Sequence, residues 1–175
     1  YLVTTDVRIL NSAFLTIEEG VTVEFEADAG LRVQSDDAAL IANGTANNPI
    51  TFTGVQEEPG FWMGLIFDSD NAENKIVHSV VEYAGSTSGQ YFEDPAAIAV
   101  HSGDQLILQN TTVRQSGNTG LFTSNNVSLP DFSQNTFTEN EVPVSIPAIL
   151  MGALDSETAF TGNTNDQILV REQTI

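Results

Sequence analysis

The chain has 175 residues, 41% of them hydrophobic, which is enough for one domain with a sizeable core. It carries 24 acidic residues against 5 basic ones, and the formal charge of −19 argues against attraction to nucleic-acid phosphates or anionic membrane surfaces. No cysteine is present, which excludes disulfides and thiolate chemistry. We therefore expect one domain over residues 1–175, with no nucleic-acid partner.

A membrane segment is not expected either. The longest uncharged apolar stretch, residues 142–154, is interrupted by Pro143 and Pro147. It is also shorter than the ~20 residues that a membrane-spanning helix needs. The sequence begins at Tyr1 without a signal-like segment, so we interpret it as a mature or excised part of a larger chain that has other domains.

Apolar and polar residues alternate with a period of two in several short segments along the chain. Examples are "VTVEF" (21–25), "ITFT" (50–53) and "QILV" (167–170), and no stretch sustains the three-to-four-residue spacing of a helix. β-Branched and aromatic residues fill these segments, whereas Gly, Asn, Asp and Ser separate them. The pattern predicts an all-β fold.

One set of these predicted strands recurs at a nearly constant interval. The strands align on an apolar position occupied by Phe52, Val81, Val113, Phe137 and Phe160. The intervals are 29, 32, 24 and 23 residues. Internal repeats of this length are typical of solenoid proteins.

A second set of predicted strands repeats independently. It aligns on Leu65, Ile98, Leu121, Val144 and Ile168, with intervals of 33, 23, 23 and 24 residues. Units of about 23 residues that each hold two or three short strands bury their apolar faces by stacking in parallel. We therefore predict a single-stranded parallel β-helix with about 23 residues per turn, right-handed because parallel crossovers strongly prefer that hand.

The segments "LTIEEGVTVEFEADAGLRV", "ALIANGTANNPITFTG" and "NKIVHSVVEYAG" carry a resemblance to known proteins. They resemble the right-handed parallel β-helix repeats of secreted and surface-anchored bacterial proteins, the pectate-lyase-like superfold. This fold is shared by polysaccharide lyases and hydrolases, adhesins and non-catalytic glycan-binding modules, so the resemblance implies an extracellular or cell-surface bacterial location and leaves the activity open. It also implies that residues 1–16 form an N-terminal cap.

The two long intervals mark insertions, and insertions into a solenoid often form its binding face. The inserted loops, residues 54–64 and 85–96, occupy the same corner of successive turns in this alignment. Together they carry four aromatic and four acidic residues: Phe61, Trp62, Tyr91, Phe92, Glu57, Glu58, Glu93 and Asp94. Aromatic rings stack on sugar faces and carboxylates accept hydrogen bonds from hydroxyl groups, so this corner is the predicted site for a neutral or cationic polysaccharide.

A structural interpretation of the same aromatic residues stays open. Trp62 lies at the start of a predicted strand, where a tryptophan commonly folds over the edge of the core. For Trp62 alone this interpretation is favoured over binding, whereas Tyr91 and Phe92 fit either role.

Calcium is the candidate cofactor. The segment "DSDNAEN" (68–74) places Asp68 and Asp70 at a spacing that an oxygen-ligated calcium ion can use. The segment lacks the glycine and closing glutamate of an EF-hand loop, and a solvated acidic turn is the favoured interpretation of it, with calcium kept as the alternative.

A catalytic constellation is not evident, so we predict no catalytic residue. Lyases that this chain resembles use a basic residue as the proton abstractor, and Arg114 is the best placed of the five basic residues. Glu82 occupies the matching position one turn earlier, which predicts an ion pair instead. The leading hypothesis is a non-catalytic polysaccharide-binding module; a structural or adhesive spacer and a polysaccharide-active lyase or hydrolase are the alternatives.

Overall fold

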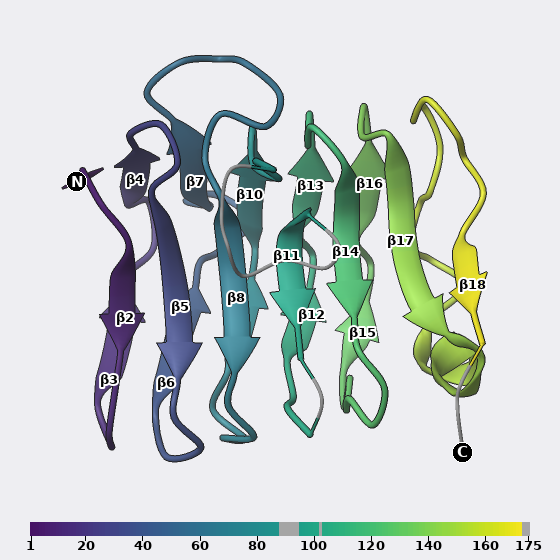
Figure 1. Cartoon of the computed structure of the whole chain (residues 1–175), viewed down its shortest axis with the longest axis horizontal. Helices are drawn as coiled ribbons and strands as arrows, with labels where there is room; N and C mark the ends of the chain where they lie inside the picture. Colours follow the sequence, from purple (N-terminus) through teal and green to yellow (C-terminus); the bar gives the residue numbers. More distant parts are fainter. Residues whose placement is uncertain (88–94, 102, 173–175) are drawn as a thin grey trace.

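The alternating segments form short strands that recur in threes and wind into a solenoid. The structure is a computed structural model that describes residues 1–87, 95–101 and 103–172. The chain advances along the long axis of the molecule, so that the first strands and residues 169–171 lie at opposite ends (Figure 1). We call each set of successive strands, one from each of three sheets, a coil.

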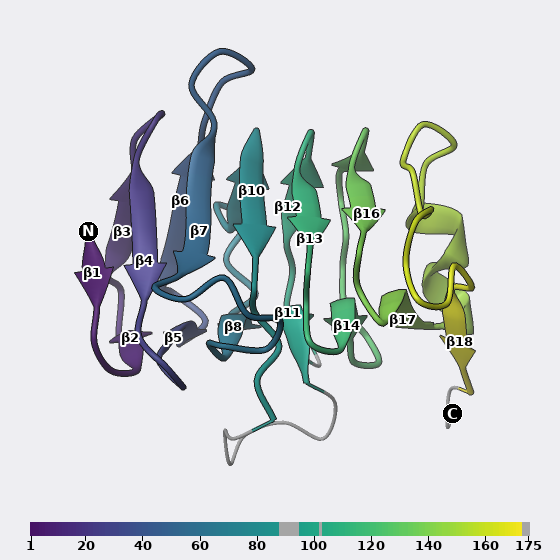
Figure 2. The same ribbon diagram turned by 90° about the horizontal axis from the view of Figure 1, so that it is seen from above.

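Sheet A has six strands among the described residues, all paired in parallel. These strands are β1 (Leu2–Val3), β4 (Thr22–Phe25), β7 (Ile50–Gly54), β10 (Ser79–Glu82), β13 (Thr112–Arg114) and β16 (Thr136–Thr138). Val81 lies opposite both Phe52 and Val113, and Val113 lies opposite Phe137. The register confirms these positions of the first predicted strand set, and Figure 2 shows the strands side by side.

Sheet B contains seven parallel strands in the described part of the chain. They are β2 (Val7–Ile9), β5 (Gly30–Gln34), β8 (Gly64–Asp68), β11 (Ala96–Val100), β14 (Thr119–Thr123), β17 (Val142–Pro147) and β18 (Leu169–Arg171). Ile98 lies opposite Leu65 and Leu121, and Leu121 lies opposite Val144. The second predicted strand set is therefore also in register.

Sheet C completes each coil. Its five described strands, again all parallel, are β3 (Phe14–Ile17), β6 (Ala39–Asn43), β9 (Lys75–Val77), β12 (Ile107–Gln109) and β15 (Phe132–Ser133). After β17 the 3₁₀ helix η1 (Ala148–Ala153) follows in place of a sheet C strand. The three parallel sheets and near absence of helix confirm the predicted all-β parallel β-helix. No helix in the described ranges has the length and hydropathy needed to cross a membrane.

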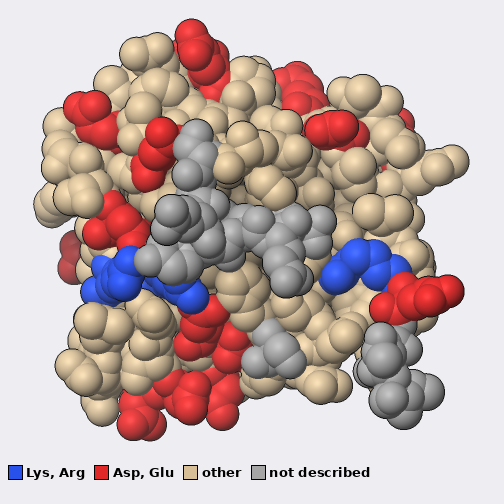
Figure 3. Space-filling view, viewed as in Figure 1, with Lys and Arg blue, Asp and Glu red and all other residues tan. Residues whose placement is uncertain are grey.

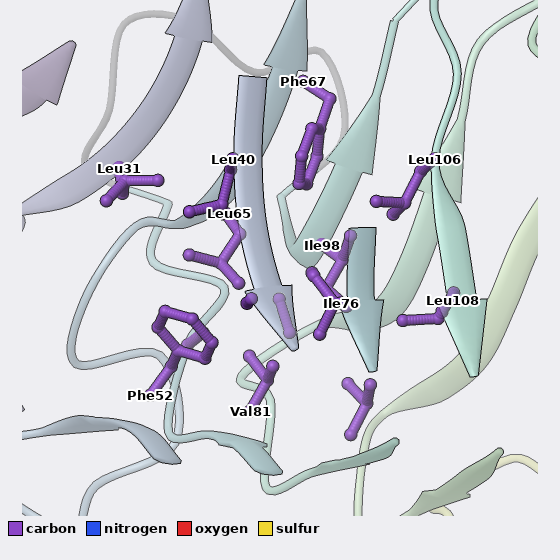
Figure 4. Close-up of a cluster of buried hydrophobic side chains, with 14 of the residues drawn as sticks. Leu31, Leu40, Phe52, Leu65, Phe67, Ile76, Val81, Ile98, Leu106 and Leu108 are labelled. Carbon is purple, nitrogen blue, oxygen red and sulfur yellow. The ribbon is translucent and has the colours of Figure 1, made fainter. Parts of the chain in front are cut away.

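The apolar core lies between the three sheets. In β4, Val23 and Phe25 are buried whereas Thr22 and Glu24 are exposed, as the period-two pattern predicts. The inward side chains of successive coils stack on one another and fill the interior (Figure 4). Burial of these stacked apolar side chains is the main favourable contribution to folding.

Parts of sheet B depart from simple alternation. Ile66, Ala99 and Phe122 alternate with the core positions yet are only 2%, 1% and 7% exposed. Ala96, Ala99 and Phe122 form an apolar cluster separate from the core, and the guanidinium of Arg171 lies 4.3 Å from the centre of the Phe122 ring. The apolar runs in these strands therefore reflect burial on both faces of the sheet.

Asparagine side chains tie successive coils together, among other places at both ends of the sheet A strands. The Asn140 amide group donates to Val113 O at 3.0 Å, and its Oδ1 accepts from Ser116 N at 3.0 Å. One coil later, Asn163 Oδ1 accepts from both Asn140 N and Asn140 Nδ2 at 3.1 Å, so the two asparagines stack. Asn135 makes equivalent bonds to Leu108 O and Thr111 N at the other end of the sheet A strands.

Residues 1–16, the predicted N-terminal cap, lie within the first coil. This coil consists of β1, β2 and β3, and each of these strands is the end strand of its sheet, so a capping role for residues 1–16 stays a prediction. A cavity of about 490 Å³ opens into this coil and is lined mainly by apolar side chains, among them Val3, Val7, Leu15 and Ile17.

Candidate functional site

The two inserted loops meet where sheet A turns into sheet B. Gly60 N donates to Ala84 O at 3.1 Å, and Ser86 N donates to Trp62 O at 3.0 Å. The loop between β7 and β8 is therefore hydrogen-bonded to the first residues after β10. As far as the second loop is described, the expected stacking of the two loops at one corner is confirmed.

A groove of about 390 Å³ lies at this corner, and we call it the corner groove. Its lining comprises Asp28, residues 58–61, residues 85–87, Gly117 and Asn118. These residues follow β4, β7, β10 and β13, so four successive coils contribute to it. Of the predicted site residues, the groove brings together Glu58 and Phe61.

Three glycines let the coils approach closely beneath the groove. A Cβ atom on Gly117 would lie 2.7 Å from Gly60 Cα, and one on Gly85 would lie 2.5 Å from Ser116 Oγ. Gly60 and Gly85 also have φ angles of +79° and +87°, which side chains disfavour. The absence of side chains at these glycines therefore allows neighbouring coils to come into close contact at this corner.

Polar side chains surround these glycines. Ser86 Oγ donates to Asp28 Oδ1 at 2.7 Å, and Asn118 Nδ2 donates to Gly85 O at 3.0 Å. Asp28 and Glu58 are exposed, and Phe61 is half-buried against the core. The groove therefore presents carboxylate, hydroxyl and amide groups beside the edge of one aromatic ring.

The prediction that the Trp62 ring face is available to a ligand is wrong. Trp62 is 0% exposed, and its ring stacks on Phe25 with centroids 4.0 Å apart and planes 5° from parallel. Its Nε1 donates to Glu82 O at 2.8 Å, so the indole is also satisfied as a donor. Because the chain turns inward after Phe61, Trp62 belongs to the core, as the structural interpretation has it.

The remaining corner residues have different positions. Glu57 is exposed but does not line the corner groove, and its charge, with that of Glu82, adds to burial in raising the pKa of Tyr83. The other four predicted binding residues, Tyr91, Phe92, Glu93 and Asp94, lie outside the described residues.

The aspartates predicted to bind calcium have protein partners here. The Asp68 carboxylate bonds with the side chains of Arg32 and His101, one from each neighbouring coil. Burial favours a higher pKa for Asp68, but the bonds and charges of His101 and Arg32 outweigh it and lower the pKa. Asp70 is exposed, and its backbone oxygen accepts from Gln105 Nε2. Within the described ranges no three His, Asp or Glu side chains are arranged to hold a metal, and calcium binding stays a prediction.

Asp104 is a residue that sequence reasoning missed. It is 7% exposed, and burial raises its pKa to about 7, with the charge of Asp68 acting in the same direction. The turn from His101 to Asp104 places its carboxyl beside the Asp68 ion pairs, since Asp104 N donates to His101 O at 3.2 Å. No local pattern marks it, because its burial comes from packing between coils.

The predicted pairing of Arg114 and Glu82 is confirmed. The two residues lie opposite each other in β13 and β10, and Arg114 Nη2 is 2.7 Å from the Glu82 carboxylate. Arg114, the basic residue that the sequence places best for proton abstraction, therefore forms an ion pair on sheet A.

Comparison with known protein families matches residues 1–91 to the pectate-lyase-like β-helix domain. The chain belongs to this family. The match spans β1 to β10, and the strands after it continue the same three-sheet pattern. No curated protein and no solved structure matches the chain. Membership of the pectate-lyase-like β-helix family supports a polysaccharide-related or structural role.

Proposed function

We propose that this domain is a non-catalytic polysaccharide-binding module of an extracellular bacterial protein. The observation that carries the proposal is the corner groove, where polar groups from four coils surround a glycine-lined surface. A groove at the inserted loops of a solenoid is a common form of binding site. The polymer and the other domains of a larger chain are the proposed partners.

The groove residues offer the interactions that sugars use. Asp28 and Glu58 accept hydrogen bonds from hydroxyl groups, and Ser86 and Asn118 add further polar groups. The exposed part of Phe61 provides an apolar contact for a sugar ring face. The described lining is mainly polar, which suits a ligand rich in hydroxyl groups.

Catalysis is not part of the proposal. Arg114 is paired with Glu82 on sheet A, and neither residue lines the groove. Of the two histidines, His101 bonds with Asp68 and His78 occupies a corner with φ of +45°. As far as the structure describes the groove lining, it contains neither a histidine nor a basic residue.

The test is binding of the purified chain to a panel of neutral, cationic and anionic polysaccharides, measured by affinity electrophoresis with calcium and then with chelator. We expect wild type to bind at least one polymer and Asp28→Asn/Glu58→Gln to bind it about tenfold more weakly, through loss of charge-assisted hydrogen bonds. The matched control is Asp131→Asn/Glu24→Gln, which removes two exposed carboxylates elsewhere, one of them also bonded to a serine.

Equal loss in the control variant would contradict a site at the groove. Release of new reducing ends or unsaturated products from the bound polymer would contradict the non-catalytic assignment. All three proteins should have the same thermal midpoint within experimental error, since the four substituted carboxylates are exposed.

A structural spacer is the second candidate, and one observation favours it. In the described part of the chain, all large exposed apolar side chains except Val55 lie in the first coil or after β17: Tyr1, Leu2, Val7, Leu10, Phe14, Ile149, Met151, Leu169 and Val170. Apolar ends suit a segment that stacks against neighbouring structure. Absence of binding to every polymer would favour this candidate over the first.

A further inference from the structure

We propose that the corner groove takes an amino-sugar segment of a polysaccharide, with an ammonium group against Asp28 and Glu58. This inference rests on the proposed function and names the class of its ligand. It is carried by the convergence of four coils at the groove and by the charge of its described lining.

Residues from four coils contribute to the groove. Asp28 lies after β4, Phe61 before β8, Ser86 after β10 and Asn118 before β14. Contacts across the corner draw these residues together, since Ser86 Oγ is 2.7 Å from Asp28 Oδ1 and a Cβ atom on Gly117 would lie 2.7 Å from Gly60 Cα. The groove is therefore compact, and its volume of about 390 Å³ suits a short segment of a sugar chain.

The glycines hold the coils close together at the groove. Gly60, Gly85 and Gly117 come from three successive coils. A Cβ atom on Gly85 would meet Ser116, and one on Gly117 would meet Gly60. Because Asp28 and Glu58 are exposed, whereas Gly85 is buried, the two carboxylates are the groups that a ligand reaches.

The charge of the lining selects among sugar classes. Asp28 and Glu58 are the ionisable residues among the described residues of the groove, and no described Lys, Arg or His lines it. A uronate polymer would place its carboxylates beside these two groups, with repulsion and no compensating cation. An ammonium group would instead form charge-assisted hydrogen bonds, which are about twice as strong as neutral ones.

The charge of the whole molecule also favours a cationic sugar over an anionic one. Four of the basic side chains are within ion-pair distance of an acidic one: Arg8, Arg32, Lys75 and Arg114. The remaining one, Arg171, lies over the Phe122 ring and donates to Thr123 O. With a net charge of −19, the molecule attracts cationic chains and repels anionic ones, and Figure 3 shows acidic side chains scattered over one face.

The decisive experiment compares a glucosamine hexamer with the N-acetylglucosamine hexamer by titration calorimetry. The two differ by acetylation of the amines, which removes the positive charges. We expect the glucosamine hexamer to bind at least about tenfold more tightly, and a galacturonic acid hexamer not to bind. Asp28→Asn/Glu58→Gln should reduce the preference to less than about threefold.

A control is needed because an acidic protein attracts any polycation. Asp131→Asn/Glu24→Gln changes the net charge equally and should keep the preference for the glucosamine hexamer. If this control loses the preference as strongly as the groove variant, the attraction is nonspecific and the inference fails.

The outcomes also separate this inference from the proposed function. Equal binding of the two hexamers, or binding of another neutral polymer that depends on Asp28 and Glu58, would overturn the amino-sugar assignment and leave polysaccharide binding intact. Binding of no polymer of any class would overturn both.

Discussion

The two adjacent aromatic residues at the corner groove have different surroundings. Phe61 is half-buried and lines the groove, whereas Trp62 lies under it, stacked on Phe25 of the preceding coil. Truncating a buried aromatic residue of this size costs about 3–5 kcal/mol. Trp62 thus supports the groove from beneath. Substituting Trp62 would destabilise the fold, so a loss of binding in that variant could not be assigned to the groove. Binding tests should therefore substitute Asp28 and Glu58.

Asp104 gives a residue-scale prediction about pH. Its folded-state pKa of about 7 lies above the ordinary value of 3.8, so the folded state binds the proton more tightly than the unfolded state does. The free energy of unfolding should therefore fall as pH rises from about 4 to about 7. Asp104→Asn should remove this decline and raise stability at pH 8 by on the order of 2 kcal/mol, after allowance for solvent screening.

Urea denaturation between pH 4 and pH 9 measures this effect, with Asp131→Asn as the exposed control. Asp68 acts in the opposite sense, since its lowered pKa means that its ion pairs are lost as pH falls through that lower value. The two groups together place the stability maximum on the acidic side of neutrality. Parallel curves for wild type and Asp104→Asn would contradict the assignment.

At the scale of the elements, the asparagine bonds hold one coil against the next. Asn140 is 1% exposed, and it satisfies Val113 O and Ser116 N, two backbone groups of the preceding coil. Parallel strands of three residues make few ladder bonds of their own, so these side-chain bonds extend the pairing around the corner. Their loss leaves buried backbone groups without partners.

Asn140→Ala should lower the free energy of unfolding by about 2–4 kcal/mol, because each unsatisfied buried group costs roughly 1–3 kcal/mol. Asn125→Ala is the matched control, since Asn125 is only half-buried in the loop after β14, and we expect a change below about 0.5 kcal/mol. Chemical denaturation of the two variants measures the difference. Similar denaturation midpoints would show that the strand ladders alone hold the coils.

The repeat alignment predicts the register of neighbouring strands well. Because the inward apolar position of each strand is equivalent from coil to coil, aligning Phe52, Val81 and Val113 also aligns their backbones. The same alignment placed Glu82 opposite Arg114, and the ion pair follows. Burial of Ile66 and Phe122 beyond the core could not be predicted, since alternation alone assigns such positions to solvent.

For the whole molecule, the net charge of −19 predicts a dependence on salt. Raising NaCl from 0.05 to 0.5 M should screen the mutual repulsion and stabilise the fold by about 1 kcal/mol, or roughly 3 °C in thermal midpoint. Calcium chloride at matched ionic strength tests the calcium prediction separately. A further rise that Asp70→Asn abolishes would support a site near Asp70, and an identical midpoint in the two salts would contradict it.

By itself, the sequence determined the all-β class, the parallel stacking, the register of two sheets and the corner at which the insertions meet. These features follow from the period of apolar residues, which every coil repeats locally. Only the tertiary structure decided that Trp62 is buried, that Asp68 joins Arg32 and His101, and that glycines from three coils lie beneath the corner groove. Those features depend on contacts between residues of different coils, which are far apart in sequence. The local pattern of residues does not determine which side chains come into contact between coils.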